Sequence, residues 1–352
     1  MYIDEFERPD DDWLRSVSEA LEHWQRIASG HSPTSSITGG GAIEVAEAAF
    51  SALHGGRPTL MMPSATFALR IALLSLAVRP GDDVLVPAID WTATRAAVLS
   101  IGARPVPVAV DPRTLTMDPG AARQVRTPMT TAAVVCHLHG VPADVDGIRD
   151  ALPGVSVIED CAQALGGLVG SAPVGTLAHA AVFSLGPGKP IDAGEGGLLV
   201  LSDGWLYRRA VKLACHPVRQ VLAGIATPRA TSFSVRPHPL AAVLALQRLH
   251  VWDPDQARQQ ARAIAEELSD HPDLEPLTPD GDRTMAGPGV PVLRREGVGD
   301  PRPPAGLLVA ASGARPLPGV RDARTLDLAS RVAVAWRRPP RAHLIPPSGD
   351  AC

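Results

Sequence analysis

Lysine is the scarcest charged residue in this sequence of 352 residues. Of the 33 basic residues, only Lys189 and Lys212 are lysines, and all the others are arginines. Arginine can replace lysine wherever only a positive charge is needed, but its guanidinium group cannot lose a proton and cannot act as a nucleophilic amine. Each of the two lysines is therefore a stronger functional candidate than a lysine in an ordinary sequence.

Cysteines and long apolar runs are also scarce. The four cysteines are too few for a disulfide framework and are typical of a reducing compartment. The acidic N-terminus does not resemble a secretion signal, and the longest apolar run, residues 67–78, is interrupted by Arg70 and too short to span a bilayer. We therefore expect a soluble, cytoplasmic protein without a membrane partner.

The charge balance excludes another class of partner. The formal net charge is −4, and charged residues make up 20% of the chain while hydrophobic residues make up 45%. This composition is typical of a globular protein, and its slight negative charge gives no reason to expect a nucleic-acid partner.

Short apolar runs alternate with segments of helical periodicity. The runs predict strands at 59–62, 84–87, 106–110, 132–136, 155–159, 180–184 and 197–201. The segments predict helices at 13–29, 42–54, 66–78, 92–101, 118–124, 144–151, 204–214 and 239–270, the last of them bent near Asp253-Pro254. Such an alternation predicts an α/β fold with a large, doubly wound, mostly parallel sheet.

The character of the sequence changes in its last third. We predict a large domain over residues 1–245 that includes the N-terminal helices, and a small α/β lobe over 246–337 with strands at 305–311 and 332–336. Prolines become frequent beyond residue 270, and residues 338–352 are predicted to form an irregular tail.

Several polar or aromatic residues follow predicted strands, at the edge where open α/β sheets bind ligands. Ser64, Ala65 and Thr66 precede a helix and suit a phosphate, although an ordinary helix cap explains them better when they are taken alone. Trp91 could stack on a flat ring or simply pack in the core. Ser184 ends another strand and could reach the same phosphate.

Two further features carry the strongest chemical signal. Glu159 and Asp160 end an apolar strand, where a carboxylate could pair with a protonated pyridine nitrogen or cap a helix. Lys189 lies in a glycine-rich turn between strands, which places it better for a cleft than for a surface ion pair. The turn is not a P-loop, because Pro190 stands where that motif requires serine or threonine.

The order and spacing of these features resemble one family. From residue 37 to about 250, the chain resembles the DegT/DnrJ/EryC1/StrS family of fold-type-I aminotransferases, which depend on pyridoxal 5'-phosphate. The resemblance includes Arg-Pro-Gly-Asp-Asp-Val at 79–84, and His-Leu-His-Gly at 137–140 followed by Pro-Ala-Asp at 142–144.

The resemblance implies a role for each candidate residue. Lys189 would form the Schiff base with the cofactor, Asp160 would pair with its ring nitrogen, and Gln163 would lie beside its ring hydroxyl. Trp91 would stack on the ring. The phosphate would be bound by the remaining candidates, Ser64, Ala65, Thr66 and Ser184. The resemblance also implies a homodimer in which each active site borrows residues from the other subunit.

The implied activity is transfer of an amino group from a glutamate- or glutamine-like donor to a keto-cyclitol, keto-sugar or other small ketone in secondary metabolism, such as antibiotic biosynthesis. Pro190 and the run Ala-Gly-Glu-Gly-Gly at 193–197 resemble the branch that acts on cyclitol ketones or makes aminohydroxybenzoate. Ser234-Val235-Arg236 replaces the Asn-x-Arg of the family, and the C-terminal lobe diverges. The alternatives are therefore another pyridoxal-phosphate reaction, such as dehydration, elimination or bond formation, and a non-catalytic paralogue.

A metal site is not predicted. Cys136, His137 and His139 lie close together in the sequence, but alternate residues of a strand point to opposite faces, so only two of the three could converge.

Overall fold

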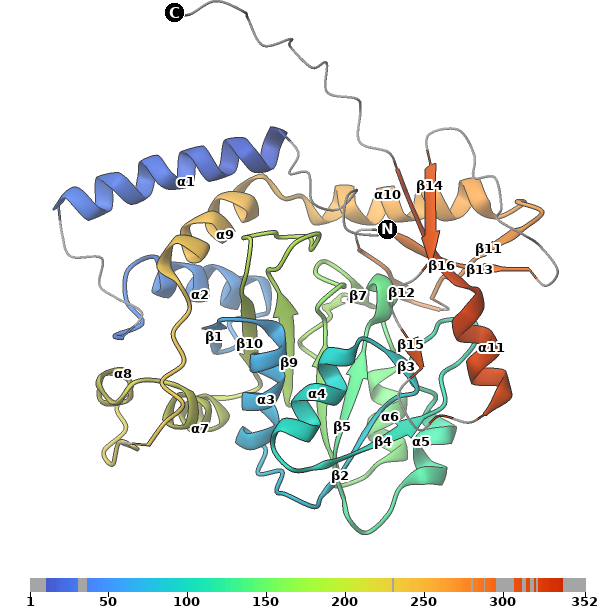
Figure 1. The fold of residues 1–352 in the computed structure, drawn as a ribbon, viewed down its shortest axis with the longest axis horizontal. Helices are drawn as coiled ribbons and strands as arrows, with labels where there is room; N and C mark the ends of the chain where they lie inside the picture. Colours follow the sequence, from blue (N-terminus) through green and yellow to red (C-terminus); the bar gives the residue numbers. More distant parts are fainter. Residues whose placement is uncertain are drawn as a thin grey trace, which may run out of the picture.

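The computed structural model of the protein describes residues 11–30, 37–229, 231–279, 281–287, 289–295, 307–311, 315–316, 320 and 322–337. The predicted tail at 338–352 lies outside these residues, and the predicted domain boundaries remain a prediction. Figure 1 shows a central sheet flanked by helices, with a second, smaller sheet built from the C-terminal part of the chain.

The central sheet has seven strands in the order β1-β10-β9-β6-β5-β2-β4. The pairs β4–β2, β2–β5, β5–β6 and β6–β9 are parallel, whereas β10 runs antiparallel to both β9 and β1. The predicted doubly wound, mostly parallel sheet is therefore confirmed. Its strands are β1 (Thr59–Met62), β2 (Asp83–Pro87), β4 (Arg104–Val108), β5 (Thr130–Cys136), β6 (Ser156–Asp160), β9 (Ala180–Ser184) and β10 (Gly197–Leu201).

Helices cover both faces of the central sheet. One face packs against α3 (Ala65–Ser75), α4 (Thr92–Ser100) and α7 (Gly204–Ala214). The other face packs against α2 (Ala42–Leu53) and α9 (Pro239–Val251) at the β1 side, and against α5 (Pro119–Val125) and α6 (Val145–Ala151) at the β4 side. Successive residues of a strand therefore pack into hydrophobic cores on opposite faces of the sheet. On β2, Val84 and Val86 face α3 and α4, whereas Leu85 faces α6.

The smaller sheet is antiparallel, in the order β11-β13-β16-β14. Its apolar side packs on α10, so this lobe has its own core. Figure 1 places it beside the central sheet, with α11 next to it. The elements are α10 (Pro254–Leu268), β11 (Leu274–Pro276), β13 (Val290–Arg294), β14 (Leu307–Ala311), α11 (Ala323–Arg331) and β16 (Val332–Arg337).

The remaining elements are short or peripheral, except for the long helix α1, which lies along α9 (Figure 1). They are α1 (Asp11–Gly30), β3 (Ile89–Asp90), the 3-10 helix η1 (Leu138–Gly140), β7 (Leu168–Val169), β8 (Ala172–Pro173), α8 (Pro217–Leu222), β12 (Arg283–Thr284) and β15 (Arg315–Pro316). Among the described residues, no helix is both long enough and apolar enough to cross a membrane.

Most predicted bounds are shifted by one or two residues, and three predicted elements differ more substantially. The predicted bent helix at 239–270 is two helices, because the Asp253 carboxylate caps α10 and Pro254 occupies its first position. The predicted strand at 106–110 begins two residues earlier, at Arg104, and Val110 instead forms an isolated bridge with Met117. The predicted helix at 66–78 ends at Ser75, because the chain adopts a positive φ of 63° at Ala77.

A buried ion pair ties the edge of the central sheet to the helices. The Glu47 carboxylate on α2 accepts hydrogen bonds from the Met61 backbone N–H at 2.7 Å and from the Arg219 guanidinium on α8 at 2.6 Å. Both side chains are about nine-tenths buried. Burial raises the pKa of Glu47, while the charge of Arg219 opposes that rise.

Removing the cation should therefore destabilise the fold strongly. We expect Arg219→Met to lower the free energy of unfolding by about 3–5 kcal/mol, because it leaves the Glu47 carboxylate buried without its partner. Urea denaturation would measure this loss, and adding Glu47→Gln should restore part of it. Arg113→Met, which removes an exposed partner of Asp111, should cost less than about 1 kcal/mol. Equal losses in both variants would contradict this reading.

Candidate active site

The candidate residues meet at the carboxyl edge of the parallel strands. Lys189 lies in the turn between β9 and β10, and its Nζ is 5.5 Å from the centre of the Trp91 ring. Trp91 caps α4 after β3, and its side chain is 41% exposed, so it is not the core tryptophan of the alternative interpretation. The amine and the aromatic face thus lie together although they are far apart in sequence.

The turn that carries Lys189 is held by one carboxylate. Asp192 accepts hydrogen bonds from the Gly188 N–H at 3.0 Å and from the Gly194 N–H at 2.8 Å. The Lys189 N–H also donates to the Gly186 carbonyl at 3.3 Å. Burial lowers the pKa of the Lys189 amine, and the charge of Asp160 opposes that shift. Sequence reasoning did not anticipate the role of Asp192.

Asp160 ends β6 inside the protein. Its Oδ1 accepts a hydrogen bond from the Ala162 N–H at 3.0 Å, and Thr94 Oγ1 donates to Oδ2 at 3.5 Å. Burial raises the pKa of Asp160, whereas the Ala162 N–H and the charge of Lys189 act in the opposite direction. The alternative of a helix cap is wrong, because the chain after β6 forms a turn and no helix begins at Asp160.

Gln163 is oriented by a backbone N–H group in the connection that follows the neighbouring strand β5. Its Oε1 accepts a hydrogen bond from the His139 N–H at 2.8 Å, and its NH₂ group has no acceptor among the residues that the structure describes. The His139 ring is buried, and burial together with the charge of Lys189 lowers its pKa to about 4. The imidazole next to the amine is therefore uncharged near neutral pH.

The start of α3 provides backbone donors. Ser64 caps this helix by accepting a hydrogen bond from the Phe67 N–H at 3.2 Å, and its carbonyl accepts from the Ala68 N–H. The N–H groups of Ala65 and Thr66 have no partner among the described residues. Free N–H groups at a helix N-terminus attract anions, so this turn can bind a phosphate.

Two residues of the neighbouring strands shape this phosphate-binding turn. A Cβ atom at Gly197 would lie 2.4 Å from the Ala65 nitrogen and 2.4 Å from the Ser64 carbonyl carbon, so β10 approaches the turn closely only because residue 197 has no side chain. Ser184, which pairs with Gly197 across the sheet, accepts a hydrogen bond from the Gly186 N–H at 3.3 Å. Ser184 therefore lies between the phosphate-binding turn and the lysine turn.

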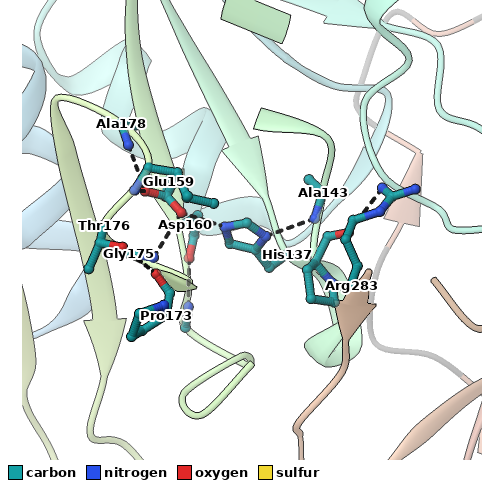
Figure 2. Close-up of polar contacts among 12 residues, drawn as sticks. His137, Ala143, Glu159, Asp160, Pro173, Gly175, Thr176, Ala178 and Arg283 are labelled. Atoms are coloured by element: carbon teal, nitrogen blue, oxygen red, sulfur yellow. Dashed lines mark hydrogen bonds and ion pairs between the residues drawn. The ribbon is translucent and has the colours of Figure 1, made fainter. Parts of the chain in front are cut away.

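Glu159, the neighbour of Asp160, points to the other face of the sheet. Figure 2 shows its carboxylate among the N–H groups of Gly175 and Ala178 and the ring of His137. Leu177 donates a further hydrogen bond at 2.8 Å. Burial alone would raise the pKa of Glu159, but the hydrogen bonds from His137 and from the backbone donors outweigh it and lower the pKa.

Hydrogen bonds within the protein account for both ring nitrogens of His137. His137 Nδ1 accepts the Ala143 N–H at 2.9 Å, so the ring hydrogen is on Nε2 and donates to Glu159 Oε2 at 3.1 Å (Figure 2). Cys161 completes a buried group with His137 and Glu159 whose ligand atoms lie within 4.8 Å of one another. Because both ring nitrogens of His137 already have hydrogen-bonding partners, these contacts make the group a structural clamp.

The residues fit pyridoxal phosphate on four independent observations. Free backbone N–H groups suit its phosphate, the exposed Trp91 face suits its ring, and buried Asp160 suits a protonated ring nitrogen. Lys189 provides an amine whose pKa is lowered by burial. No metal is needed for any of these contacts.

Comparison with known proteins supports the same interpretation. The sequence pattern described as the DegT/DnrJ/EryC1/StrS aminotransferase family matches residues 23–299. An L-glutamine:2-deoxy-scyllo-inosose aminotransferase from Micromonospora echinospora is 39% identical over 171 residues, which cover 47% of this chain and 40% of that protein. The chain matches only 39–52% of the length of such curated relatives.

Solved structures resemble the chain over a longer range. An aminotransferase from Streptoalloteichus hindustanus has a TM-score of 0.76 and 26% identity, and the match covers 94% of this chain and 91% of that one. A 3-amino-5-hydroxybenzoic acid synthase has a TM-score of 0.68 and 27% identity, with 82% and 74% coverage. The fold-type-I architecture predicted from the sequence is thereby confirmed.

Filling the space at Gly197 tests the phosphate-binding turn. We expect Gly197→Ala to displace the Ser64–Thr66 backbone and to weaken pyridoxal-phosphate binding by about tenfold or more, since overpacking typically costs about 1–3 kcal/mol. Titration of the cofactor-free protein, followed by absorbance, would measure the affinity. Gly204→Ala is the matched control, because its nearest neighbour is the flexible end of Arg208 at 3.5 Å. Unchanged affinity in Gly197→Ala would argue against a phosphate at this turn.

Proposed function

The chain belongs to the DegT/DnrJ/EryC1/StrS aminotransferase family, and on that premise we propose that it uses pyridoxal 5'-phosphate to transfer an amino group from an amino acid to a small ketone. The observation that carries the proposal is the convergence of Lys189, Trp91 and Asp160 at one edge of the sheet. An amine, an aromatic face and a buried acid together are what the chemistry of this cofactor requires.

Each site residue has a proposed task in binding. The N–H groups of Ala65 and Thr66, with the hydroxyls of Ser64 and Ser184 nearby, would hold the phosphate. Trp91 would cover one face of the ring, and the free NH₂ group of Gln163 would donate to the ring hydroxyl. Asp160 would keep a proton on the ring nitrogen, because a buried carboxylate is stabilised by a cation beside it.

The reaction needs a group that moves a proton. When bound, pyridoxal phosphate withdraws electrons from the carbon that carries the donor's amino group and makes that carbon acidic. Lys189 Nζ would accept this proton and return it, and burial favours the uncharged amine that can do so. His139, uncharged beside Lys189, adds no further positive charge near neutral pH.

The relatives indicate the class of acceptor. Several are named as glutamine:2-deoxy-scyllo-inosose or glutamine:scyllo-inosose aminotransferases, and one as a sugar-nucleotide 3-aminotransferase. We propose a keto-cyclitol as the acceptor, with a keto-sugar or another small ketone as the alternative, and glutamine or glutamate as donor. Amino-cyclitols and amino-sugars are components of antibiotics, so we propose a place in secondary metabolism.

We also propose a homodimer that shares its active sites. A groove of about 990 Å³ runs between α1, α9 and α10 and reaches Pro190, the residue after Lys189. Leu14 and Val251, on two of these helices, are large apolar side chains with exposures of 47% and 67%. A second copy covering them would close the site. Three free, buried cysteines agree with the cytoplasm as the proposed location.

The two lysines allow a controlled test of the proposed function. We expect Lys189→Ala and Lys189→Arg to lower the turnover number by at least ~10²–10⁴-fold, because neither side chain can accept the proton. The bleaching of the cofactor's visible absorption by an amino donor should disappear in both. Lys212→Arg, at a residue that contacts Thr227 on the surface, should behave as the wild type. Bleaching retained in both Lys189 variants would refute the assignment.

Product analysis tests the type of reaction. With glutamine or glutamate and 2-deoxy-scyllo-inosose, we expect one 2-oxo acid for each amino-cyclitol formed, and much slower reaction with a nucleotide-linked keto-sugar. Mass spectrometry of both products would measure this ratio. Consumption of the ketone without a 2-oxo acid would instead indicate dehydration, elimination or bond formation. A folded protein that binds no pyridoxal phosphate would indicate a non-catalytic paralogue.

A further inference from the structure

A second buried carboxyl group, that of Asp90, lies near Asp160, the proposed partner of the ring nitrogen. Asp90 ends β3, directly before Trp91, and its side chain is 1% exposed. Its Oδ1 accepts the Trp91 N–H at 2.7 Å. Its Oδ2 is buried and has no partner with hydrogen-bonding geometry among the described residues. A buried oxygen without a donor is costly if it carries charge.

The strand register brings Asp90 and Asp160 together. Cys136, at the end of β5, pairs with Asp160 across the sheet, and its thiol also approaches Asp90. Thr94 on α4 lies near both carboxyl groups: its Oγ1 is 3.5 Å from Asp160 Oδ2, and it also interacts with Asp90. Its single hydroxyl hydrogen can serve only one of them at a time. One hydroxyl cannot donate to two carboxylates at once, and the Cys136 thiol near Asp90 is only a weak donor. The donors around the pair therefore do not suffice for two buried carboxylates.

Two adjacent carboxyl groups in a buried site do not both ionise easily, because like charges repel and burial disfavours each charge. The Lys189 cation favours ionisation of Asp160. The charged groups that line a cavity of about 220 Å³ together with Asp90 are Arg95 on α4 and Arg315 on β15. Burial first, and the charge of Asp160 second, nevertheless raise the pKa of Asp90 to about 7.

We propose that Asp90 is a positioning residue that keeps a proton on Oδ2 beside an ionised Asp160 and releases this proton as the pH rises. The number of negative charges facing the cofactor's ring nitrogen then changes from one to two. This proposal rests on the proposed function for its cofactor, but the proton itself belongs to the cofactor-free protein.

The direction of the pH effect follows from the sign of the charge. Below about pH 6, Asp90 is neutral and the site holds one carboxylate. Above about pH 8, the added negative charge stabilises positive charge on the bound cofactor and delays the loss of its proton. The midpoint of the cofactor's absorption change should therefore lie higher than it would without Asp90, by on the order of one pH unit.

Asp90→Asn is the most informative variant, because the amide keeps the acceptor for the Trp91 N–H and cannot ionise. We expect the absorption of the bound cofactor to match the wild type below about pH 6 and to diverge above about pH 8, with a midpoint lower by about one unit. Asp83→Asn is the matched control: Asp83 is a buried aspartate at the opposite end of β2, and we expect the wild-type profile there. The proposal is overturned if the absorption profiles of Asp90→Asn and the wild type superpose at every pH. It is also overturned if they differ equally at every pH, as a structural effect would predict.

Infrared spectroscopy of the cofactor-free protein tests the proton independently of cofactor binding. We expect a C=O band of a protonated carboxylic acid at pH 6 that is lost by about pH 8.5, and that is absent in Asp90→Asn. In Asp160→Asn, where the neighbouring like charge is removed, the band should disappear at a lower pH. A band that persists in Asp90→Asn, or whose midpoint does not move in Asp160→Asn, contradicts the proposal. If Asp90→Asn does not fold, the wild-type and Asp160→Asn measurements still decide it.

If the protein binds no pyridoxal phosphate, the proposed function fails while the infrared experiment still reports on Asp90. If the cofactor binds but the infrared and absorption results contradict the proposal, the function stands and the role of Asp90 falls. The two failures are thereby distinguished.

Discussion

The buried carboxylate of Glu159 is the interaction on which the arrangement of the site depends. It accepts hydrogen bonds from three backbone N–H groups of the 175–178 turn and from His137, and thus joins the ends of β5 and β6 to that turn. A buried charge is tolerable only when it is fully paired, so the surrounding chain has little freedom to move. This anchor fixes the end of β6, and the next residue, Asp160, is therefore held at the edge beside Lys189.

Strand alternation then separates residues that are neighbours in the sequence. Glu159, His137 and Cys161 lie on one face of the sheet, while Asp160 and Cys136 lie on the other, with α4 and Thr94. The first group is a structural clamp, and the second surrounds the proposed cofactor nitrogen. The same alternation places Cys136 and His137 on opposite faces, and His137 contributes to the fold through its hydrogen bonds to Glu159 and Ala143.

The predicted elements followed from local patterns. Most of the central sheet was predictable because hydrophobic periodicity is a property of residues that are neighbours in the sequence. The bounds were less accurate where distant contacts decided them. β4 begins at Arg104, whose side chain pairs with Asp83 on the neighbouring strand. The break at Asp253-Pro254 was visible as a bend, but only the capping carboxylate makes it the start of a separate helix. The short strands β3 and β15 pair residues more than 200 positions apart, and no local pattern indicates them.

The sequence by itself determined which chemical groups are present at the edge: an amine at Lys189, an aromatic ring at Trp91, an acid at Asp160 and a capped helix start at Ser64. These groups occupy characteristic places relative to strands, and residue type and spacing are local properties. Only the tertiary structure decided that Glu159 anchors the site, that Gly197 makes room for the phosphate-binding turn, and that Asp90 lies beside Asp160. Burial, charge pairing and the partner of each hydrogen bond depend on residues that are distant along the chain, and folding alone brings them together.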